Sequence, residues 1–379
     1  MYKTFWYSLH MVKKNQSVRK LSVGILGATG MVGQRFISLL ENHPWFEVRA
    51  VAASRNSAGK TYSEAVKGRW KFANPIPTGV RGLTVYSVED DVRKIKSQVD
   101  FVFSAMDMEK DAIRALEELY ASNGIPVVSN NSAHRWTADV PMIMPEINPD
   151  HLAMIPIQKK NRGWDSGFIV VKPNCSVQSY IPALEALKRF GPQKMIVSTL
   201  QAISGAGKTF ETMPEILDNA IPFIGGEEGK SEKEPMKILG RIERGAFKLA
   251  KTPKISATCI RIPVTDGHMA SVTVSFKTKP TKEAIVKAWR NFKNPLERLN
   301  LPSSPEKFLT YFEEDNRPQT KLDRDISRGM GISIGRLRED SILGWKFISL
   351  SHNTIRGAAG GAILVAELLK AKGYLKAKT

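Results

Sequence analysis

The sequence is poor in cysteine and histidine and holds no long apolar run, and each absence excludes a class of protein. Two cysteines in 379 residues cannot build a disulfide framework, so we expect free thiols and a reducing, cytoplasmic compartment. No stretch reaches the ~18 consecutive apolar residues that cross a membrane, so no membrane partner is expected. The six histidines include no pair at metal-ligand spacing, and no metal site is expected.

Acidic residues are also scarce, with 37 Asp and Glu against 56 Lys and Arg and a formal net charge of +19. Residues 1–20 carry basic residues and no acid. They lack the apolar core of a secretory signal, so we interpret them as a basic tail, with a transit peptide as the alternative. Elsewhere the positive charge is scattered among carboxylates. This pattern is typical of a solvated surface and of anionic substrates or cofactors, and nucleic acid is not expected as a partner.

Hydrophobic patterning predicts an α/β chain with two domains. The balance of 42% hydrophobic and 25% charged residues is that of a globular protein and excludes disorder as the main state. Between residues 21 and 170, short apolar strands alternate with helical segments, as in a parallel sheet. Between 171 and 350, longer strands alternate polar and apolar residues, which indicates an α+β domain with a mixed sheet. Residues 351–379 are expected to form a C-terminal helix.

A glycine-rich turn follows the first strand, Leu21–Leu26, and opens a helix. Gly27, Gly30 and Gly33 permit a tight turn that brings helix N-terminal amides to a pyrophosphate. This context favours dinucleotide binding over a purely structural turn. At the end of the second strand, where an NAD site has an acidic residue, the chain has Ser54-Arg55-Asn56-Ser57. Hydroxyls and a cation there favour the 2′-phosphate of NADP over a merely solvated turn.

Cys175 stands between a strand and a helical run, directly after Pro173 and Asn174. Asn174 or Ser176 is able to cap that helix, and the positive end of the helix dipole favours a thiolate. Cys175 is therefore predicted to be a nucleophile, with an inert buried cysteine as the alternative. Cys259 lies inside an apolar strand and is predicted to be structural.

A thiol nucleophile needs a base, and His268 follows the Asp266-Gly267 turn at the mouth of a strand. We interpret His268 as that base, although a structural histidine is the common alternative. Arg261, shortly upstream, has the planar fork that grips a carboxylate. By composition alone, the segment Glu227-Glu228-Gly229-Lys230 is a charged loop face.

Several longer strings occur together and in order: Gly27–Gln34, Ser129–Arg135, Asn174–Ser176, Leu200–Gly207, Ile221–Glu228, Arg261–His268, Arg317–Gln319 and His352–Gly357. Through them the chain resembles the aspartate-semialdehyde dehydrogenase family, in the branch typified by archaeal and fungal enzymes, from Leu21 to about Tyr374. The resemblance implies a Rossmann-like NADP-binding domain at 21–170 and a catalytic and oligomerisation domain at 171–350. It further implies that the helix in 351–379 returns to the NADP-binding domain, and that the chain forms homodimers or homotetramers.

The resemblance also implies a reaction, the NADPH-dependent reduction of L-aspartyl 4-phosphate to L-aspartate 4-semialdehyde with release of inorganic phosphate, on the path to lysine, threonine and methionine. Cys175 would form a thioester, His268 would move the proton, and Gln201 would orient the substrate. The implied substrate-binding residues are Arg261 for the α-carboxylate, Glu227 for the α-ammonium, and Lys230 with Arg135 for the phosphate. The implied cofactor-binding residues are Gly27, Thr29, Gly30, Met31, Val32, Gly33, Ser54, Arg55, Ser57, Ser104, Ser204, Gly205 and Asn353.

Other functions compete with this interpretation. Malonyl-CoA reductase and N-acetylglutamyl-phosphate reductase are rivals within the fold, but malonyl-CoA has no ammonium that requires a carboxylate near Arg261. A non-catalytic nucleotide-fold binding protein is disfavoured because Cys175, His268 and Arg261 occur together. Ser204–Thr209 resembles the end of a phosphate-binding loop, but Ala202 replaces the required glycine, which disfavours a kinase or ATPase.

Overall fold

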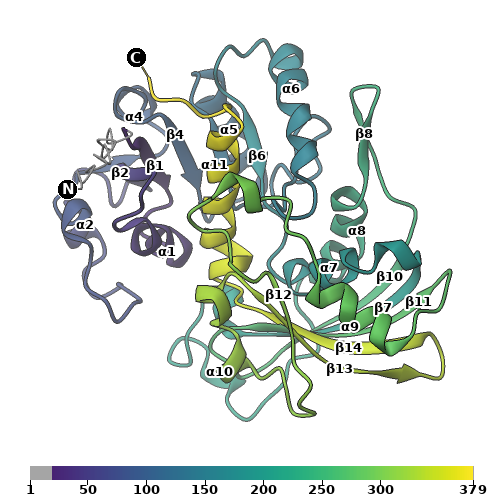
Figure 1. Cartoon of the computed structure of the whole chain (residues 1–379). Coiled ribbons are helices and arrows are strands. Elements are labelled where there is room, and N and C mark those ends of the chain that lie inside the picture. The colour runs from purple at the N-terminus through teal and green to yellow at the C-terminus, as the bar shows by residue number, and fades with distance from the viewer. Residues whose placement is uncertain (1–18, 379) are drawn as a thin grey trace, which may run out of the picture.

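The computed structural model describes residues 19–378 (Figure 1). The predicted basic tail, apart from Arg19 and Lys20, lies outside the described residues. Two sheets dominate the structure, one near the N-terminus and one in the second half of the chain.

The first sheet is parallel and has the strand order β3-β2-β1-β4-β5-β6. Its strands are mostly apolar and buried, as expected for a parallel sheet covered by helices, apart from the exposed Glu47 and Arg49 of β2. They are β1 (Leu21–Leu26), β2 (Phe46–Ala53), β3 (Val85–Ser87), β4 (Phe101–Ser104), β5 (Val127–Ser129) and β6 (Ile169–Val171). The accompanying helices are α1 (Met31–Leu40), α2 (Tyr62–Ala65), α3 (Thr78–Arg81), α4 (Val92–Gln98), α5 (Lys110–Ser122) and α6 (Met154–Arg162). This order is that of a Rossmann fold, in which ligands lie at the carboxyl ends of the strands.

The second sheet is mixed and has the order β10-β7-β11-β14-β13-β12. Its strands are β7 (Pro192–Gln201), β10 (Lys254–Arg261), β11 (His268–Phe276), β12 (Leu309–Tyr311), β13 (Ile332–Asp340) and β14 (Gly344–Ser351). The pairs β10–β7 and β12–β13 are parallel, and the other neighbours are antiparallel. This domain also contains α7 (Val177–Glu185), α8 (Glu227–Ile238), α9 (Lys282–Arg290) and α10 (Thr320–Asp323). A hairpin of β8 (Arg241–Glu243) and β9 (Ala246–Lys248) projects from the body of the molecule (Figure 1).

The last helix, α11 (Gly360–Ala371), follows the second sheet in sequence but packs with the first. Its residues from Gly360 to Leu369 are buried, and they join the apolar cluster that includes β1 and α1. A turn at Ile355–Ala359 leads into it. The chain therefore crosses between its two halves directly before α11 (Figure 1).

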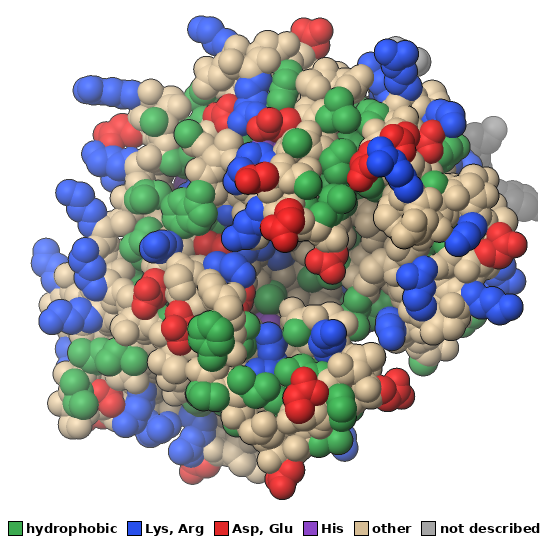
Figure 2. All heavy atoms as spheres, turned by 180° about the vertical axis from the view of Figure 1, so that it is seen from behind, with side chains coloured by type: hydrophobic (Ala, Val, Ile, Leu, Met, Phe, Trp, Pro, Cys, Tyr) green, Lys and Arg blue, Asp and Glu red, His purple; other side chains and the backbone are tan. Residues whose placement is uncertain are grey.

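The predicted fold class, a Rossmann-like domain followed by an α+β domain with a mixed sheet, is confirmed. Within the described residues, no helix is long and apolar enough to cross a membrane. Lys and Arg side chains are spread over the face shown in Figure 2, with Asp and Glu between them.

Candidate active site

Cys175 lies in the loop that connects β6 to α7. The Asn174 side chain contacts the start of this helix, because its Oδ1 accepts from the backbone N–H of Ser176, the N-cap residue, at 2.7 Å and of Val177 at 3.4 Å. The segment before α11 packs closely against Cys175, because a Cβ added to Gly357 would lie 2.6 Å from the Cys175 Cβ. Glycine is required there, and Cys175 is fixed between the start of α7 and the segment that leads into α11.

The charges around Cys175 do not favour a free thiolate in the resting structure. Burial raises the pKa of the thiol, the Glu227 carboxylate raises it further, and the cations of Lys172, Arg135 and Lys230 lower it in part. The helix position therefore does not by itself give the low pKa that the sequence suggests. The other cysteine, Cys259, is fully buried in β10, in agreement with a structural role.

His268 is fully buried at the first position of β11. Its Nδ1 accepts from the backbone N–H of Ala202 at 3.1 Å, while its Nε2 has no partner within residues 19–378. Burial, followed by the nearby Arg261 cation, lowers the pKa of His268 to about 3. The imidazole is therefore neutral at physiological pH. Because a backbone N–H can only donate, the ring proton resides on Nε2.

Gly205 makes room for both His268 and Arg261. A Cβ at this position would lie 3.0 Å or less from the His268 ring and 3.0 Å from Arg261 Nη1. Arg261, at the end of β10, donates from Nη1 to Ala202 O at 2.6 Å, which leaves Nε and Nη2 available to a ligand. The imidazole and the guanidinium thus meet against one glycine, as a shared substrate site requires.

Glu227 is the first residue of α8 and the centre of a buried hydrogen-bond network. Its carboxylate accepts from Asn174 Nδ2 at 3.0 and 3.1 Å, from Lys230 Nζ at 2.7 Å and from Gln201 Nε2 at 3.4 Å. Burial favours the neutral acid, but the Lys230 ammonium and these hydrogen bonds together lower the pKa of Glu227 below its ordinary value. Glu227, Gln201 and Lys230 are therefore brought together beside Cys175, with Lys230 already paired.

Arg135 is buried beneath the same site, but a carboxylate already holds it. Its Nη1 donates to Glu234 Oε1 at 2.8 Å and its Nε to Lys172 O at 3.1 Å. The other Glu234 oxygen accepts from the Asn174 backbone N–H at 2.7 Å. Arg135 thus supports the Asn-Cys segment, and one N–H of Nη1 and both of Nη2 remain for a ligand.

The glycine turn has the close contacts that a dinucleotide site needs. A Cβ on Gly27 would lie 2.3 Å from Ala105 O, and one on Gly33 would lie 2.2 Å from Gly27 O. Gly30 has no atom nearer than 3.5 Å to such a Cβ, so its face is open to a ligand. A pocket of about 180 Å³ adjoins this turn; among the residues that line it are Gly27, Thr29, Gly30, Ser54 and Ala105. The glycine turn and its pocket therefore fit a nucleotide.

Arg55 does not stand free at the edge of this pocket. Its Nε and Nη2 donate to the two Asp90 oxygens at 2.7 and 2.9 Å, and Nη2 also lies 2.7 Å from Glu89 Oε2. The sequence interpretation considered only the end of the second strand and missed these carboxylates, which follow β3. Arg55 remains 67% exposed, so a 2′-phosphate can reach it only in competition with Asp90 and Glu89.

Three further predicted cofactor residues, Ser104, Ser204 and Asn353, fall into two groups. Ser204 and Asn353 meet at 2.8 Å, and Asn353 also accepts from the Gly267 backbone N–H, next to His268. Ser104 instead accepts from Asn131 at 2.9 Å inside a buried network. Its hydroxyl is therefore engaged in the protein interior.

Three residues of the site were not found from the sequence: Lys172, Glu234 and Asp266. Glu234 lies seven residues after Glu227, two helical turns along one face of α8, and that spacing was a usable signal. Asp266 accepts from Ser204 Oγ at 2.7 Å, which ties the turn before His268 to the Ser204 loop.

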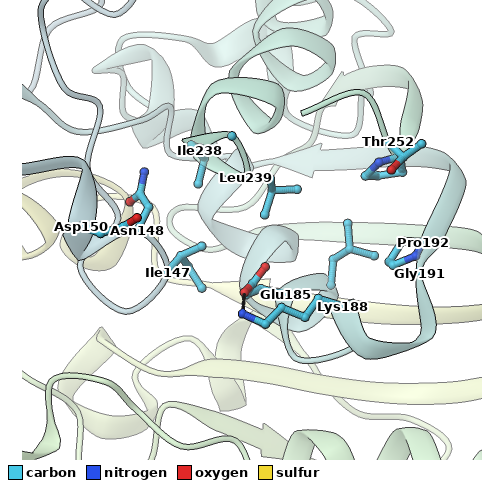
Figure 3. Close-up of a pocket in the computed structure, with 13 residues that line it drawn as sticks. Ile147, Asn148, Asp150, Glu185, Lys188, Gly191, Pro192, Ile238, Leu239 and Thr252 are labelled. Carbon is cyan, nitrogen blue, oxygen red and sulfur yellow. Dashed lines mark hydrogen bonds and ion pairs between the residues drawn. The ribbon is translucent and has the colours of Figure 1, made fainter. Parts of the chain in front are cut away.

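A separate pocket of about 430 Å³ lies away from this cluster (Figure 3). Residues lining it include Ile147, Asn148, Glu185, Lys188 and Thr252. None of the predicted catalytic, substrate or cofactor residues takes part in it, so it offers no support for the chemistry of Cys175.

Comparison with known proteins agrees with this geometry. Residues 22–155 match the model of the semialdehyde dehydrogenase NAD binding domain, and residues 183–356 match that of the semialdehyde dehydrogenase dimerisation domain. Fold and site thus define a semialdehyde dehydrogenase. The aspartate-semialdehyde dehydrogenase of Archaeoglobus fulgidus is 45% identical over 92% of this chain and 98% of its own, and that of Aspergillus fumigatus is 42% identical over 95% and 99%. The chain belongs to the aspartate-semialdehyde dehydrogenase family.

Solved structures support the same assignment. Aspartate-semialdehyde dehydrogenase of Candida albicans, solved with NADP, superposes with a TM-score of 0.84 at 37% identity and covers 94% of this chain and 100% of its own. A Vibrio cholerae aspartate-semialdehyde dehydrogenase gives a TM-score of 0.70 at 25% identity, with 93% and 99% covered. These relatives favour the family over the malonyl-CoA reductase and non-catalytic alternatives.

Proposed function

We propose that this chain catalyses the reversible, NADPH-dependent reductive dephosphorylation of L-aspartyl 4-phosphate to L-aspartate 4-semialdehyde in the pathway to lysine, threonine and methionine. The observation that carries the proposal is the convergence of Cys175, Arg261, Glu227 and His268 at one buried site. An acyl phosphate with an α-amino acid end needs a nucleophile, a cation and a carboxylate, and this site holds all three.

In the proposed reaction the Cys175 sulfur attacks the acyl carbonyl, the carbonyl–phosphate bond breaks, and a thioester remains on the enzyme. Bound NADPH supplies a hydride to such a thioester. His268 donates a hydrogen bond from Nε2 to the oxygen that carries the developing negative charge. Reformation of the carbonyl then releases the semialdehyde and returns the electron pair to sulfur.

The proposed substrate contacts follow from the charged and hydrogen-bonding groups that the site can offer to a ligand. Arg261 holds the α-carboxylate through Nε and Nη2. The substrate α-ammonium pairs with the Glu227 carboxylate and replaces Lys230 there. The Lys230 ammonium can then bind the phosphate. Arg135 supports the phosphate through Nη2, and Gln201 keeps Glu227 oriented. Competition between two ammonium groups for Glu227 would thus couple substrate binding to phosphate binding.

For the cofactor, the glycine turn at 27–33 holds the pyrophosphate, and Ser54, Arg55 and Ser57 face the adenosine end. Gly205, Ser204 and Asn353 lie near His268, on the nicotinamide side. The relative from Candida albicans solved with NADP supports this choice of cofactor.

Assembly as a homodimer or homotetramer is part of the proposal. The match to a dimerisation domain model supports it, as does the exposed face of the second sheet, where Ile196 of β7 is 50% exposed. Inorganic phosphate is the proposed second product. A cytoplasmic setting is proposed because the chemistry needs a reduced Cys175, and both cysteines are free thiols.

The test is the reverse reaction, in which aspartate semialdehyde reduces NADP and its acyl group is transferred to inorganic phosphate. We expect NADPH formation that depends on phosphate, and we expect wild-type protein to reduce malonyl-CoA more slowly than it oxidises the semialdehyde. Faster reduction of malonyl-CoA would overturn the substrate assignment, even with Cys175 established as the nucleophile.

A further inference from the structure

Glu234 of α8 is a buried carboxylate that the proposed mechanism does not use. Only 1% of this residue is exposed. One carboxylate oxygen accepts from Arg135 Nη1 at 2.8 Å, and the other accepts from the backbone N–H of Asn174 at 2.7 Å. Because both partners are donors, both contacts need the two acceptor oxygens of an ionised carboxylate. Glu234 therefore joins the residue proposed to bind phosphate to the residue that precedes Cys175.

The same ion pair holds the backbone that leads from β6 to the thiol. Arg135 Nε donates to Lys172 O at 3.1 Å, and Glu234 accepts from the Asn174 N–H two residues further on. The proline between them has no N–H to donate. These two backbone groups thus find their partners in side chains, and without them they would be buried and unsatisfied. The spacing between Arg135 and the segment that carries the thiol therefore depends on Glu234.

Helix α8 carries four charged residues of alternating sign on one face. They are, in order along the helix, Glu227, Lys230, Glu234 and Lys237. Their spacing of three or four residues places them on the same side of the helix. Lys237 also holds Arg135, because its Nζ donates to Arg135 O at 2.8 Å. One helix thus fixes Arg135 through both its guanidinium and its backbone, and the same face carries the proposed contacts to the substrate ammonium and to phosphate.

A carboxylate on Arg135 either positions the guanidinium or competes with phosphate for it, and the structure favours positioning. The side chains of Arg135 and Glu234 are 7% and 1% exposed, so a phosphate that displaced Glu234 would leave a buried charge without its partner. Displacement is also unnecessary. Within residues 19–378, one N–H of Arg135 Nη1 and both of Nη2 have no protein acceptor, so Arg135 can bind phosphate while it keeps Glu234.

We propose that Glu234 is a positioning residue that holds Arg135 and the Asn174–Cys175 segment at a fixed spacing, so that a bound phosphate faces the acyl group on the thiol. The inference rests on the proposed function, in which inorganic phosphate is a substrate of the reverse reaction. There a phosphate oxygen attacks the thioester carbonyl, the carbon–sulfur bond breaks, and its electron pair stays on sulfur. Loss of Glu234 should impair this step and spare the earlier hydride transfer to NADP, which needs no phosphate.

The test separates the two steps in Glu234→Gln, whose amide oxygen accepts from Arg135 or from the Asn174 N–H while its NH₂ group faces the other donor. In steady state with NADP and aspartate semialdehyde, the KM for phosphate should rise by about tenfold or more, and the KM for the semialdehyde should stay within about threefold of wild type. Without phosphate, stopped-flow absorbance should still show a burst of NADPH at close to the wild-type rate. A merely destabilised enzyme would lose burst amplitude and keep its KM for phosphate.

Glu232→Gln is the matched control. Glu232 lies on the same helix and also accepts a backbone N–H, that of Ala257 at 3.1 Å, but this contact is with β10 and not with the site. Both KM values should stay unchanged in this variant. Glu234→Asp keeps the charge that neutralises Arg135 but is one methylene shorter, so it should raise the KM for phosphate by about threefold or more.

An unchanged KM for phosphate in Glu234→Gln would overturn the inference, and so would a fall in that KM, which would mean that Glu234 competes with phosphate. A burst slowed as strongly as the phosphate step would also overturn it. If Glu234→Gln fails to fold, Glu234→Asp decides in the same assay. Wild-type protein without phosphate-dependent NADPH formation would refute the proposed function itself, whereas an active wild type with unchanged Glu234 variants would refute this inference alone.

Discussion

The thiol site and the edge of the nucleotide pocket both hold opposite charges in pairs, but one set is buried and the other is exposed. Glu227 and Arg135 are 7% and 6% exposed, whereas the side chains of Arg55 and Asp90 are 67% and 53% exposed. A buried pair leaves an uncompensated charge when one partner is lost, while water screens an exposed pair. The geometry around Cys175 is therefore fixed by buried pairs, whereas the contacts of Arg55 at the edge of the nucleotide pocket can be exchanged more easily.

The largest effect that this comparison predicts comes from the thiol itself. Cys175→Ala should abolish turnover while NADPH binding stays within a few fold, because in the proposed mechanism the sulfur forms the acyl intermediate and the glycine turn holds the cofactor. Steady-state kinetics and cofactor fluorescence titration give the two readouts. Mass spectrometry of wild type with an electrophilic substrate analogue should find the adduct on Cys175, and activity loss through an adduct on Cys259 would contradict the assignment.

The sequence predicted those parts of this site that depend on local order. The strand, the glycine turn and α1 are adjacent in the chain, and Asn174 lies next to Cys175, so the turn and the position of Cys175 at the start of a helix could be inferred. The partners of Arg135 and Arg55 could not. Glu234 reaches Arg135 only because α8 packs beside α7, and Asp90 reaches Arg55 only because β3 pairs with β2.

A second variant tests the buried network at Glu227. Glu227→Gln keeps the shape but offers a neutral amide to the substrate ammonium and to Lys230. A loss of ~1.5–3 kcal/mol of charge-assisted bonding predicts a ten- to hundredfold fall in kcat/KM for aspartate semialdehyde.

The companion variant Lys230→Ala should raise the KM for phosphate most strongly. If Lys230 only orients Glu227, the double variant with both Glu227→Gln and Lys230→Ala will have the same kcat/KM as Glu227→Gln alone. A Glu227→Gln enzyme with wild-type kcat/KM would exclude Glu227 from substrate binding.

Burial of His268 should affect the pH dependence of the free energy of unfolding as well as the rate of turnover. Burial lowers the pKa of His268 from 6.5 to about 3, so between these values the unfolded chain binds a proton that the folded chain does not. The free energy of unfolding therefore rises with pH in this window and falls on acidification, with a contribution of up to ~1.4 kcal/mol per pH unit.

Denaturant titrations at several pH values should show a smaller slope for His268→Gln than for wild type. His134 and His352, whose burial lowers each pKa to about 4, contribute equally to both proteins. Equal slopes in the two proteins would mean that His268 is accessible to protons in the folded state.

The smallest effect is expected at the exposed pair, and it bears on the choice of NADP over NAD. Arg55 is held by Asp90, whose pKa this contact keeps at about 2, so a 2′-phosphate gains Arg55 only by displacing a carboxylate. Arg55→Ala should therefore raise the KM for NADP by about tenfold, the lower end of what an unshared guanidinium would give, and leave NAD nearly unaffected.

The variant Asp90→Asn tests whether Asp90 competes with the 2′-phosphate for Arg55, which Arg55→Ala cannot show because it removes the cation itself. With the carboxylate removed, Arg55 is freer to meet the phosphate, and NADP should bind a few fold more tightly while NAD binding is unchanged. Titration calorimetry with NADP, NAD and 2′-phosphoadenosine measures this directly, and Glu89→Gln should act in the same direction with a smaller change. If Asp90→Asn instead weakened NADP, the ion pair would be orienting Arg55 toward the phosphate, and the exposed edge would be as preorganised as the buried site.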